Sequence, residues 1–180
     1  MKEGDAMFHS QTYGELKLEE IPAKIFDYFE KMKKFDSPLH ITVGTDSQNF
    51  SDTKMVSVIT VTSEGHGGIF FYEISRLTRI SDVTQKLYTE TDMSLKIMKK
   101  LLAIFDADPQ KYGKLTNTAT FTIHVDASRN EKGKTYKIVD GIITWIKGEG
   151  FANGKDKPSF DYAIKPNSYA ASSVADRISK

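Results

Sequence analysis

Apolar residues recur at the spacing of an α-helix in the N-terminal part of the chain. Ile21, Ile25 and Met32 share one side of residues 19–35, and charged residues separate them. Such a repeat is typical of a helix with one buried face. Ser37-Pro38 follows, and a residue before proline is disfavoured in the helical conformation. The pattern therefore predicts an amphipathic helix over residues 19–35.

Three strand-like runs follow this helix. Residues 40–47 alternate between two faces, residues 55–62 are rich in Val, Ile and Thr, and residues 69–77 follow a glycine-rich turn. β-Branched and aromatic residues favour strands, and short turns between such runs favour antiparallel pairing. We expect a three-stranded antiparallel meander.

A long amphipathic helix is predicted over residues 81–106. Ser81 or Asp82 suits the N-cap, because a short side-chain oxygen there can accept a free backbone N–H. The helix should end before Pro109. Its inner stripe would consist of Val83, Leu87, Glu90, Ser94, Ile97, Leu101 and Phe105.

The remaining pattern alternates strands with helices: a strand at 118–127, a helix at 135–147, a strand at 159–165 and a closing helix at 168–180. A meander followed by two strand–helix units predicts an α/β fold with a mixed five-stranded sheet, two of its strands parallel, flanked by helices. We expect one domain over residues 1–180, because 180 residues suit a single core. A helical extension over about residues 1–36 would precede a core over about 39–180.

Composition narrows the class of protein. Hydrophobic residues make up 39% of the chain and charged residues 27%, as in ordinary globular proteins. The sequence contains no cysteine, which excludes disulfides, a thiolate nucleophile and a cysteine zinc site. No apolar run approaches the length of a membrane span, and the polar N-terminus does not resemble a signal peptide. We therefore expect a cytoplasmic protein without a membrane partner.

Charge is distributed unevenly along the chain. Residues 1–110 carry 13 Lys/Arg and 17 Asp/Glu, a net −4, whereas residues 111–180 carry 12 and 7, a net +5. A basic C-terminal part suits a polyanionic partner such as nucleic acid. A solvated surface with ordinary scatter of charge is the alternative.

Glu90 is the most informative acidic residue. It lies on the predicted inner stripe of the long helix, where an apolar residue is expected. An unpaired buried carboxylate costs several kcal/mol, roughly, so a cation, a partner or an open cleft should accompany it. The alternative is a buried salt bridge to Arg76 or Arg79.

Asp46 and Asp126 lie near the C-terminal ends of two predicted strands. If these strands pair in parallel, the two carboxylates become neighbours, and they repel each other unless a cation neutralises them. With Glu90 from a helix packed across that edge, three oxygen ligands would converge. Such a donor set suits Mg²⁺ or Mn²⁺ rather than zinc. A strand-end aspartate facing solvent is the alternative for each residue.

Further polar residues accompany these acids. Asp176 lies off the apolar stripe of the last predicted helix, so it faces either a cleft or water. His124 shares a strand face with Asp126, and it could support the metal ligands or be a core histidine bonded to the backbone. Ser47, which follows Asp46, is a second supporting candidate. The candidates for phosphate binding follow Asp126, with a solvated loop as the alternative: Arg129, Lys132, Lys134 and Lys137.

Several segments together resemble the ribonuclease H-like superfamily, and within it the YkuK-like group of predicted nucleases. The segments follow the order of that group from about residue 40 to the end of the chain. They are Val43-Gly44-Thr45-Asp46-Ser47-Gln48, Tyr88-Thr89-Glu90-Thr91, Ile123-His124-Val125-Asp126, Ile164-Lys165-Pro166 and Tyr169-Ala170-Ala171-Ser172-Ser173-Val174-Ala175-Asp176.

This resemblance implies a ribonuclease H-like fold and a two-metal nuclease that uses Mg²⁺ or Mn²⁺. Asp46 would bridge both metals, Glu90 and Asp126 would hold one, and Asp176 would hold the other. The implied partner is nucleic acid, with RNA, DNA and hybrid all open, as are the mode of cleavage and the oligomeric state. A non-catalytic nucleic-acid-binding or protein-interaction module that keeps the fold is the alternative function.

Overall fold

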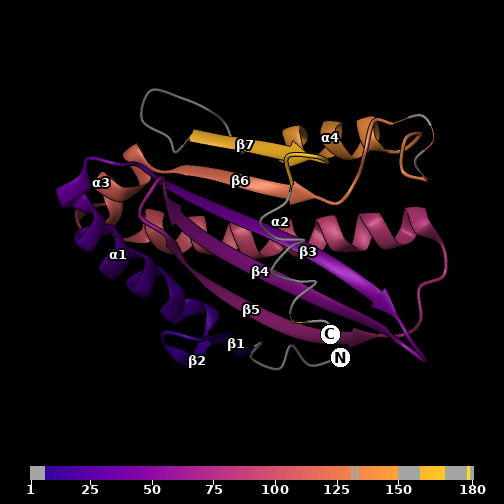
Figure 1. The fold of residues 1–180 in the computed structure, drawn as a ribbon, viewed down its shortest axis with the longest axis horizontal. Helices are drawn as coiled ribbons and strands as arrows, with labels where there is room; N and C mark the ends of the chain where they lie inside the picture. Colours follow the sequence, from indigo (N-terminus) through magenta and orange to yellow (C-terminus); the bar gives the residue numbers. More distant parts are fainter. Residues whose placement is uncertain (1–6, 131, 133, 150–158, 169–177, 179–180) are drawn as a thin grey trace.

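The computed structural model describes residues 7–130, 132, 134–149, 159–168 and 178. Its centre is a mixed sheet of seven strands in the order β2-β1-β5-β4-β3-β6-β7 (Figure 1). The strands are β1 (Met7–Ser10), β2 (Gly14–Lys17), β3 (Leu39–Asn49), β4 (Thr53–Ser63), β5 (Gly68–Leu77), β6 (Thr120–Val125) and β7 (Ser159–Ile164).

The predicted meander is confirmed. β3 pairs with β4 over its whole length, from Leu39↔Ser63 to Asn49↔Thr53, and β4 pairs with β5 in the same antiparallel manner. On its other side, β3 pairs in parallel with β6, and β6 pairs in parallel with β7. β3 therefore lies at the boundary between the antiparallel part of the sheet and the parallel part.

The N-terminal region differs from the prediction, because a hairpin of β1 and β2 precedes the expected helix. It lies beside β5 and extends the sheet from five strands to seven. Gly14 closes the hairpin turn with φ 74°, a conformation that glycine adopts without strain. Each strand has only four residues, which is too few for an alternating pattern to stand out.

The helices are α1 (Ile21–Met32), α2 (Val83–Ala107), α3 (Pro109–Thr118) and α4 (Val139–Gly148), with short 3₁₀ turns on both sides of α1. The sequence pattern did not predict α3, because Pro109 indicated the end of a helix. Proline instead occupies the first turn of α3, where its missing N–H removes no helical bond, and Asp108 caps that turn. Asp82 caps α2 by accepting the N–H of Gln85, as predicted.

One large apolar core joins all four helices to a single face of the sheet. Ile41, Val43 and Phe121 represent the strands in this core, whereas the alternate residues of the same strands point to the opposite face. Figure 1 shows α2 running along the length of the sheet. On the opposite face, Val56 and Val58 form a smaller cluster with Tyr72 and with Ile178 near the C-terminus.

Within the described part of the chain, no helix is both long and apolar enough to cross a membrane.

Candidate functional site

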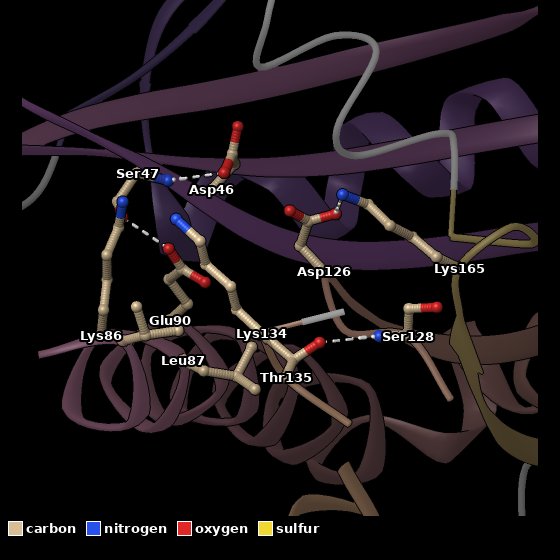
Figure 2. Close-up of a pocket in the computed structure, with 11 residues that line it drawn as sticks. Asp46, Ser47, Lys86, Leu87, Glu90, Asp126, Ser128, Lys134, Thr135 and Lys165 are labelled. Carbon is tan, nitrogen blue, oxygen red and sulfur yellow. Dashed lines mark hydrogen bonds and ion pairs between the residues drawn. The ribbon is translucent and has the colours of Figure 1, made fainter. Parts of the chain in front are cut away.

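A pocket of about 440 Å³ opens where β3 and β6 separate (Figure 2). The two strands pair from His40↔Thr120 to Gly44↔His124, and β3 then continues along β4 alone. The carboxyl ends of parallel strands at such a change of neighbour are a common place for ligands. Three acids and three lysines contribute to its lining: Asp46, Glu90, Asp126, Lys86, Lys134 and Lys165.

Asp46 and Asp126 reach this pocket from neighbouring strands. Each lies two residues beyond the last paired position, Gly44↔His124, so both project on the face opposite the helices. Both side chains are half-buried. Asp46 accepts a hydrogen bond from the backbone N–H of Ser47 at 2.8 Å. The parallel pairing on which their predicted proximity depended is thus present.

Glu90 enters the pocket from α2. Its residue is only 7% exposed, and Ser47 Oγ donates to Glu90 Oε1 at 2.5 Å. The pKa of Glu90 is raised to about 8. Burial is the largest cause and the charges of Asp46 and Asp126 add to it, whereas the Ser47 hydrogen bond and Lys86 oppose it. Glu90 thus lies within electrostatic reach of both aspartates, in surroundings that disfavour its charged form.

The alternative salt bridge from Glu90 to Arg76 or Arg79 is wrong. Arg76 pairs with Asp52 at 2.9 Å, and Arg79 donates to the carbonyl oxygen of Phe50 at 2.7 Å. Neither of these two guanidinium groups therefore offsets the burial of Glu90 on the inner stripe of α2.

A hydroxyl network fixes α2 against β3 beside the pocket. Ser94, one turn after Glu90, donates to Thr45 Oγ1 at 3.0 Å, and Thr45 shares a 3.0 Å bond with Ser57 on β4. Ser94 also bonds the carbonyl oxygen of Glu90 at 3.0 Å. Buried polar groups that satisfy one another in this way specify one packing arrangement. The network fixes the position of the Glu90 turn of α2 along β3.

Asp126 has a partner that the sequence pattern did not indicate. Lys165 Nζ lies 2.6 Å from Asp126 Oδ1, and Figure 2 shows the two side chains pointing toward each other. Lys165 follows β7, whose pairing with β6 ends at Val125↔Ile164. Only knowledge of that register makes Lys165 the neighbour of Asp126, although its segment contributed to the family resemblance.

Of the four cations predicted to bind phosphate, Lys134 alone lines the pocket. Arg129 instead pairs with Asp140 at 2.9 Å on an exposed surface, and Lys132 and Lys137 are exposed outside the pocket. Lys86 was missed, although it lies one helical turn before Glu90 in the sequence. A lysine at that spacing shares a helix face with Glu90, which was an available signal.

His124 is not among the residues that line the pocket of Asp126. It lines a second pocket, toward the other end of the same strands, and burial lowers its pKa to about 4 while a hydrogen bond with the backbone of Ser168 opposes that shift. This arrangement corresponds to the backbone-bonded histidine that was the alternative. Ser47, by contrast, contacts Glu90 directly. Asp176 lies outside the described residues.

The donor chemistry of the pocket fits a hard divalent cation. It offers three carboxylates, and no histidine or cysteine among the described residues lines it. Within the described ranges, however, no group of three or more His, Cys, Asp or Glu side chains is arranged to hold an ion. The structure thus brings the three acids to one pocket without closing them around one point.

Comparison with known proteins agrees with this architecture. A family model described as ribonuclease H-like matches residues 20–180, a span that includes β3, α2 and β6 and therefore all three acids. No curated protein and no solved structure matches the chain. Because the family match covers most of the sequence, the chain belongs to the ribonuclease H-like family.

Proposed function

We propose that the protein is a divalent-metal-dependent nuclease that hydrolyses phosphodiester bonds in nucleic acid. The observation that carries this proposal is the burial of Glu90 in the same pocket as Asp46 and Asp126, with no arginine partner among the residues that the structure describes. An arrangement that raises the pKa of a carboxyl to about 8 is unfavourable for a folded protein unless a cation offsets it.

Asp46, Glu90 and Asp126 are the residues that would hold Mg²⁺ or Mn²⁺, with Asp176 as the fourth proposed ligand. When bound, such ions supply an activated water and stabilise the developing charge on the phosphate oxygens. Ser47 orients Glu90 through its hydroxyl. Lys86 and Lys134 add positive charge to the walls of the pocket, where the phosphates of a nucleic acid would enter.

Two observations favour the non-catalytic alternative. The ammonium of Lys165 already neutralises Asp126, and the described acids do not form a ready metal-binding group. A module that binds nucleic acid through the lysines of this pocket, without metal, would account for both features. The two functions differ in whether metal is required, which makes them separable by experiment.

The test is cleavage of labelled single-stranded RNA, single-stranded DNA, duplexes and RNA–DNA hybrid, with Mn²⁺ and with chelator. We compare the wild type with Asp126→Asn and with Asp106→Asn, the same change at an exposed position near the end of α2. The nuclease proposal expects Mn²⁺-dependent cleavage by the wild type and by Asp106→Asn, and loss of cleavage in Asp126→Asn. Binding without cleavage of any substrate would favour the non-catalytic module.

The substrate panel also addresses the partner. The proposed partner is nucleic acid, and the member of the panel that is cut fastest identifies its class. A cytoplasmic location remains our proposal, and it is consistent with a chain that contains no cysteine.

A further inference from the structure

We propose that Lys165 acts as a built-in cation that competes with divalent metal for Asp126 and so sets the metal affinity of the pocket. This inference rests on the proposed metal-dependent function. It concerns a residue to which neither the sequence pattern nor the family resemblance assigned a role.

The backbone places Lys165 beside Asp126. β6 and β7 are parallel and in register up to Val125↔Ile164, so Asp126 and Lys165 are the next pair of positions. The N–H of Lys165 donates to the carbonyl oxygen of Ala127 at 2.9 Å, which continues the contact between the two segments past the ends of β6 and β7. Neighbouring positions of parallel strands project on the same face. The pairing of the two strands therefore places the ammonium beside Asp126, in addition to the conformation of the flexible side chain.

The contact uses one of the two Asp126 oxygens that a metal could bind. Lys165 Nζ lies 2.6 Å from Asp126 Oδ1, and the Asp126 side chain is 27% exposed. A Mg²⁺ ligand oxygen lies at about 2.1 Å from the ion. An ammonium and a dication at the same carboxylate oxygen repel each other. Metal binding through this oxygen would therefore favour withdrawal of Lys165.

After leaving Asp126, the ammonium of Lys165 would still contribute positive charge to the pocket. The Lys165 side chain is 51% exposed, so it can turn away from Asp126 without breaking a packed core. It lines the same pocket as Lys86 and Lys134, which places three ammonium groups around the proposed entry of a phosphate. In this account Lys165 neutralises Asp126 before metal arrives, and afterwards contributes to binding of the anionic substrate.

The experiment measures Mn²⁺ affinity by titration calorimetry and by the electron paramagnetic resonance signal of free Mn²⁺. Wild type is compared with Lys165→Met and Lys165→Gln, which remove the charge, and with Lys165→Arg, which keeps it. The matched control is Lys96→Met, because Lys96 forms an ion pair with Asp92 of the same 2.6 Å length, on α2 and outside the pocket lining. Circular dichroism checks that each variant is folded.

We expect both neutral variants to bind Mn²⁺ roughly 3- to 10-fold more tightly than wild type, the range that an exposed ion pair and a nearby charge contribute. Lys165→Arg and Lys96→Met should stay near wild type. Unchanged or weaker binding by the neutral variants would overturn the inference while leaving the metal site intact, as would an equal gain in Lys96→Met. If neither wild type nor any variant binds Mn²⁺, the inference and the proposed metal function are both wrong.

Discussion

A pocket lies at each end of the region in which β3 and β6 pair. The two pockets have similar volumes but differ in the side chains that line them. Where the strands begin, a pocket of about 400 Å³ is lined by the hydroxyl groups of four threonines, including Thr42, Thr60 and Thr122, together with two histidines, Glu64 and Asn167. Where the strands separate, a pocket of about 440 Å³ is lined by three acids and three lysines. Pocket volume therefore does not distinguish a candidate site from a groove in this fold. A cluster of charged side chains at the carboxyl ends of the strands does.

The physical origin of the difference lies in the strand pairing. At the hydroxyl end, β3 and β6 are hydrogen-bonded from His40↔Thr120 onward, so their side chains stand on a continuous pleated surface. At the acidic end, β3 has lost β6 as a neighbour, and Glu90 of α2 can approach the same opening as Asp46. A gap between strands lets side chains from both faces of the sheet meet.

The largest expected effect is on the rate of cleavage, which should depend on the acidic pocket and not on the hydroxyl pocket. Asp46→Asn should reduce Mn²⁺-dependent cleavage by at least about 100-fold, because a metal ligand supports several kcal/mol of transition-state stabilisation. Thr42→Val, four residues earlier on the same strand face, alters only the hydroxyl pocket and should change the rate less than about threefold, since it removes no charge. Initial rates of both variants measure this contrast, and equal losses in the two would contradict it.

The second effect concerns stability and its dependence on pH in the presence of chelator. Glu90→Gln should raise the free energy of unfolding by about 2 kcal/mol at pH 9, because a neutral amide replaces a buried charge. Folding raises the pKa of Glu90 from 4.5 to about 8, so the contribution of Glu90 to wild-type stability is most favourable at low pH and falls as pH rises between these values. The gain should accordingly disappear near pH 4.5.

Urea unfolding at a series of pH values tests this prediction, with Glu64→Gln in the hydroxyl pocket as the control. That control should change stability little at any pH, because Glu64 is exposed. Saturating Mn²⁺ should reverse the order, stabilising wild type more than Glu90→Gln. A pH-independent effect of Glu90→Gln would show that its carboxyl is not held in a charge-excluding environment.

A smaller effect is expected from the hydroxyl that supports Glu90. Ser47→Ala removes the donor of the 2.5 Å bond and should lower the free energy of unfolding by about 1 kcal/mol. It should also raise the pKa of Glu90 further, since that bond favours the charged form. Carboxyl chemical shifts across a pH titration report the pKa, and an unchanged midpoint would contradict the assigned role of Ser47.

The smallest effect concerns nucleic-acid affinity in chelator. Lys134→Met should weaken binding by about threefold and reduce the salt dependence of the binding constant by about one ion, as for one lost phosphate contact. Lys137→Met, an exposed lysine outside the pocket lining, should change neither quantity measurably. Fluorescence anisotropy at several salt concentrations compares the two, and similar losses would point to diffuse surface attraction.

Periodicity accounts for the features that the sequence predicted. The meander, α2 and the parallel strands follow from alternation and helical spacing, and Glu90 was identified because it interrupts an apolar stripe. The hairpin of β1 and β2 escaped because four-residue strands carry too little pattern. Lys165 escaped for a different reason, since only the register of β7 makes it a neighbour of Asp126. Local pattern predicts elements, whereas pairing across elements decides which charges meet.

The most direct test of the carboxylate pocket is the anomalous scattering of Mn²⁺ in crystals of the wild-type protein soaked with MnCl₂. Our account predicts an anomalous peak in the pocket at about 2.1–2.3 Å from carboxylate oxygens of Asp46, Glu90 and Asp126, with Lys165 moved away from Asp126. A pocket without a peak at saturating Mn²⁺, with the Lys165–Asp126 ion pair still in place, would contradict it.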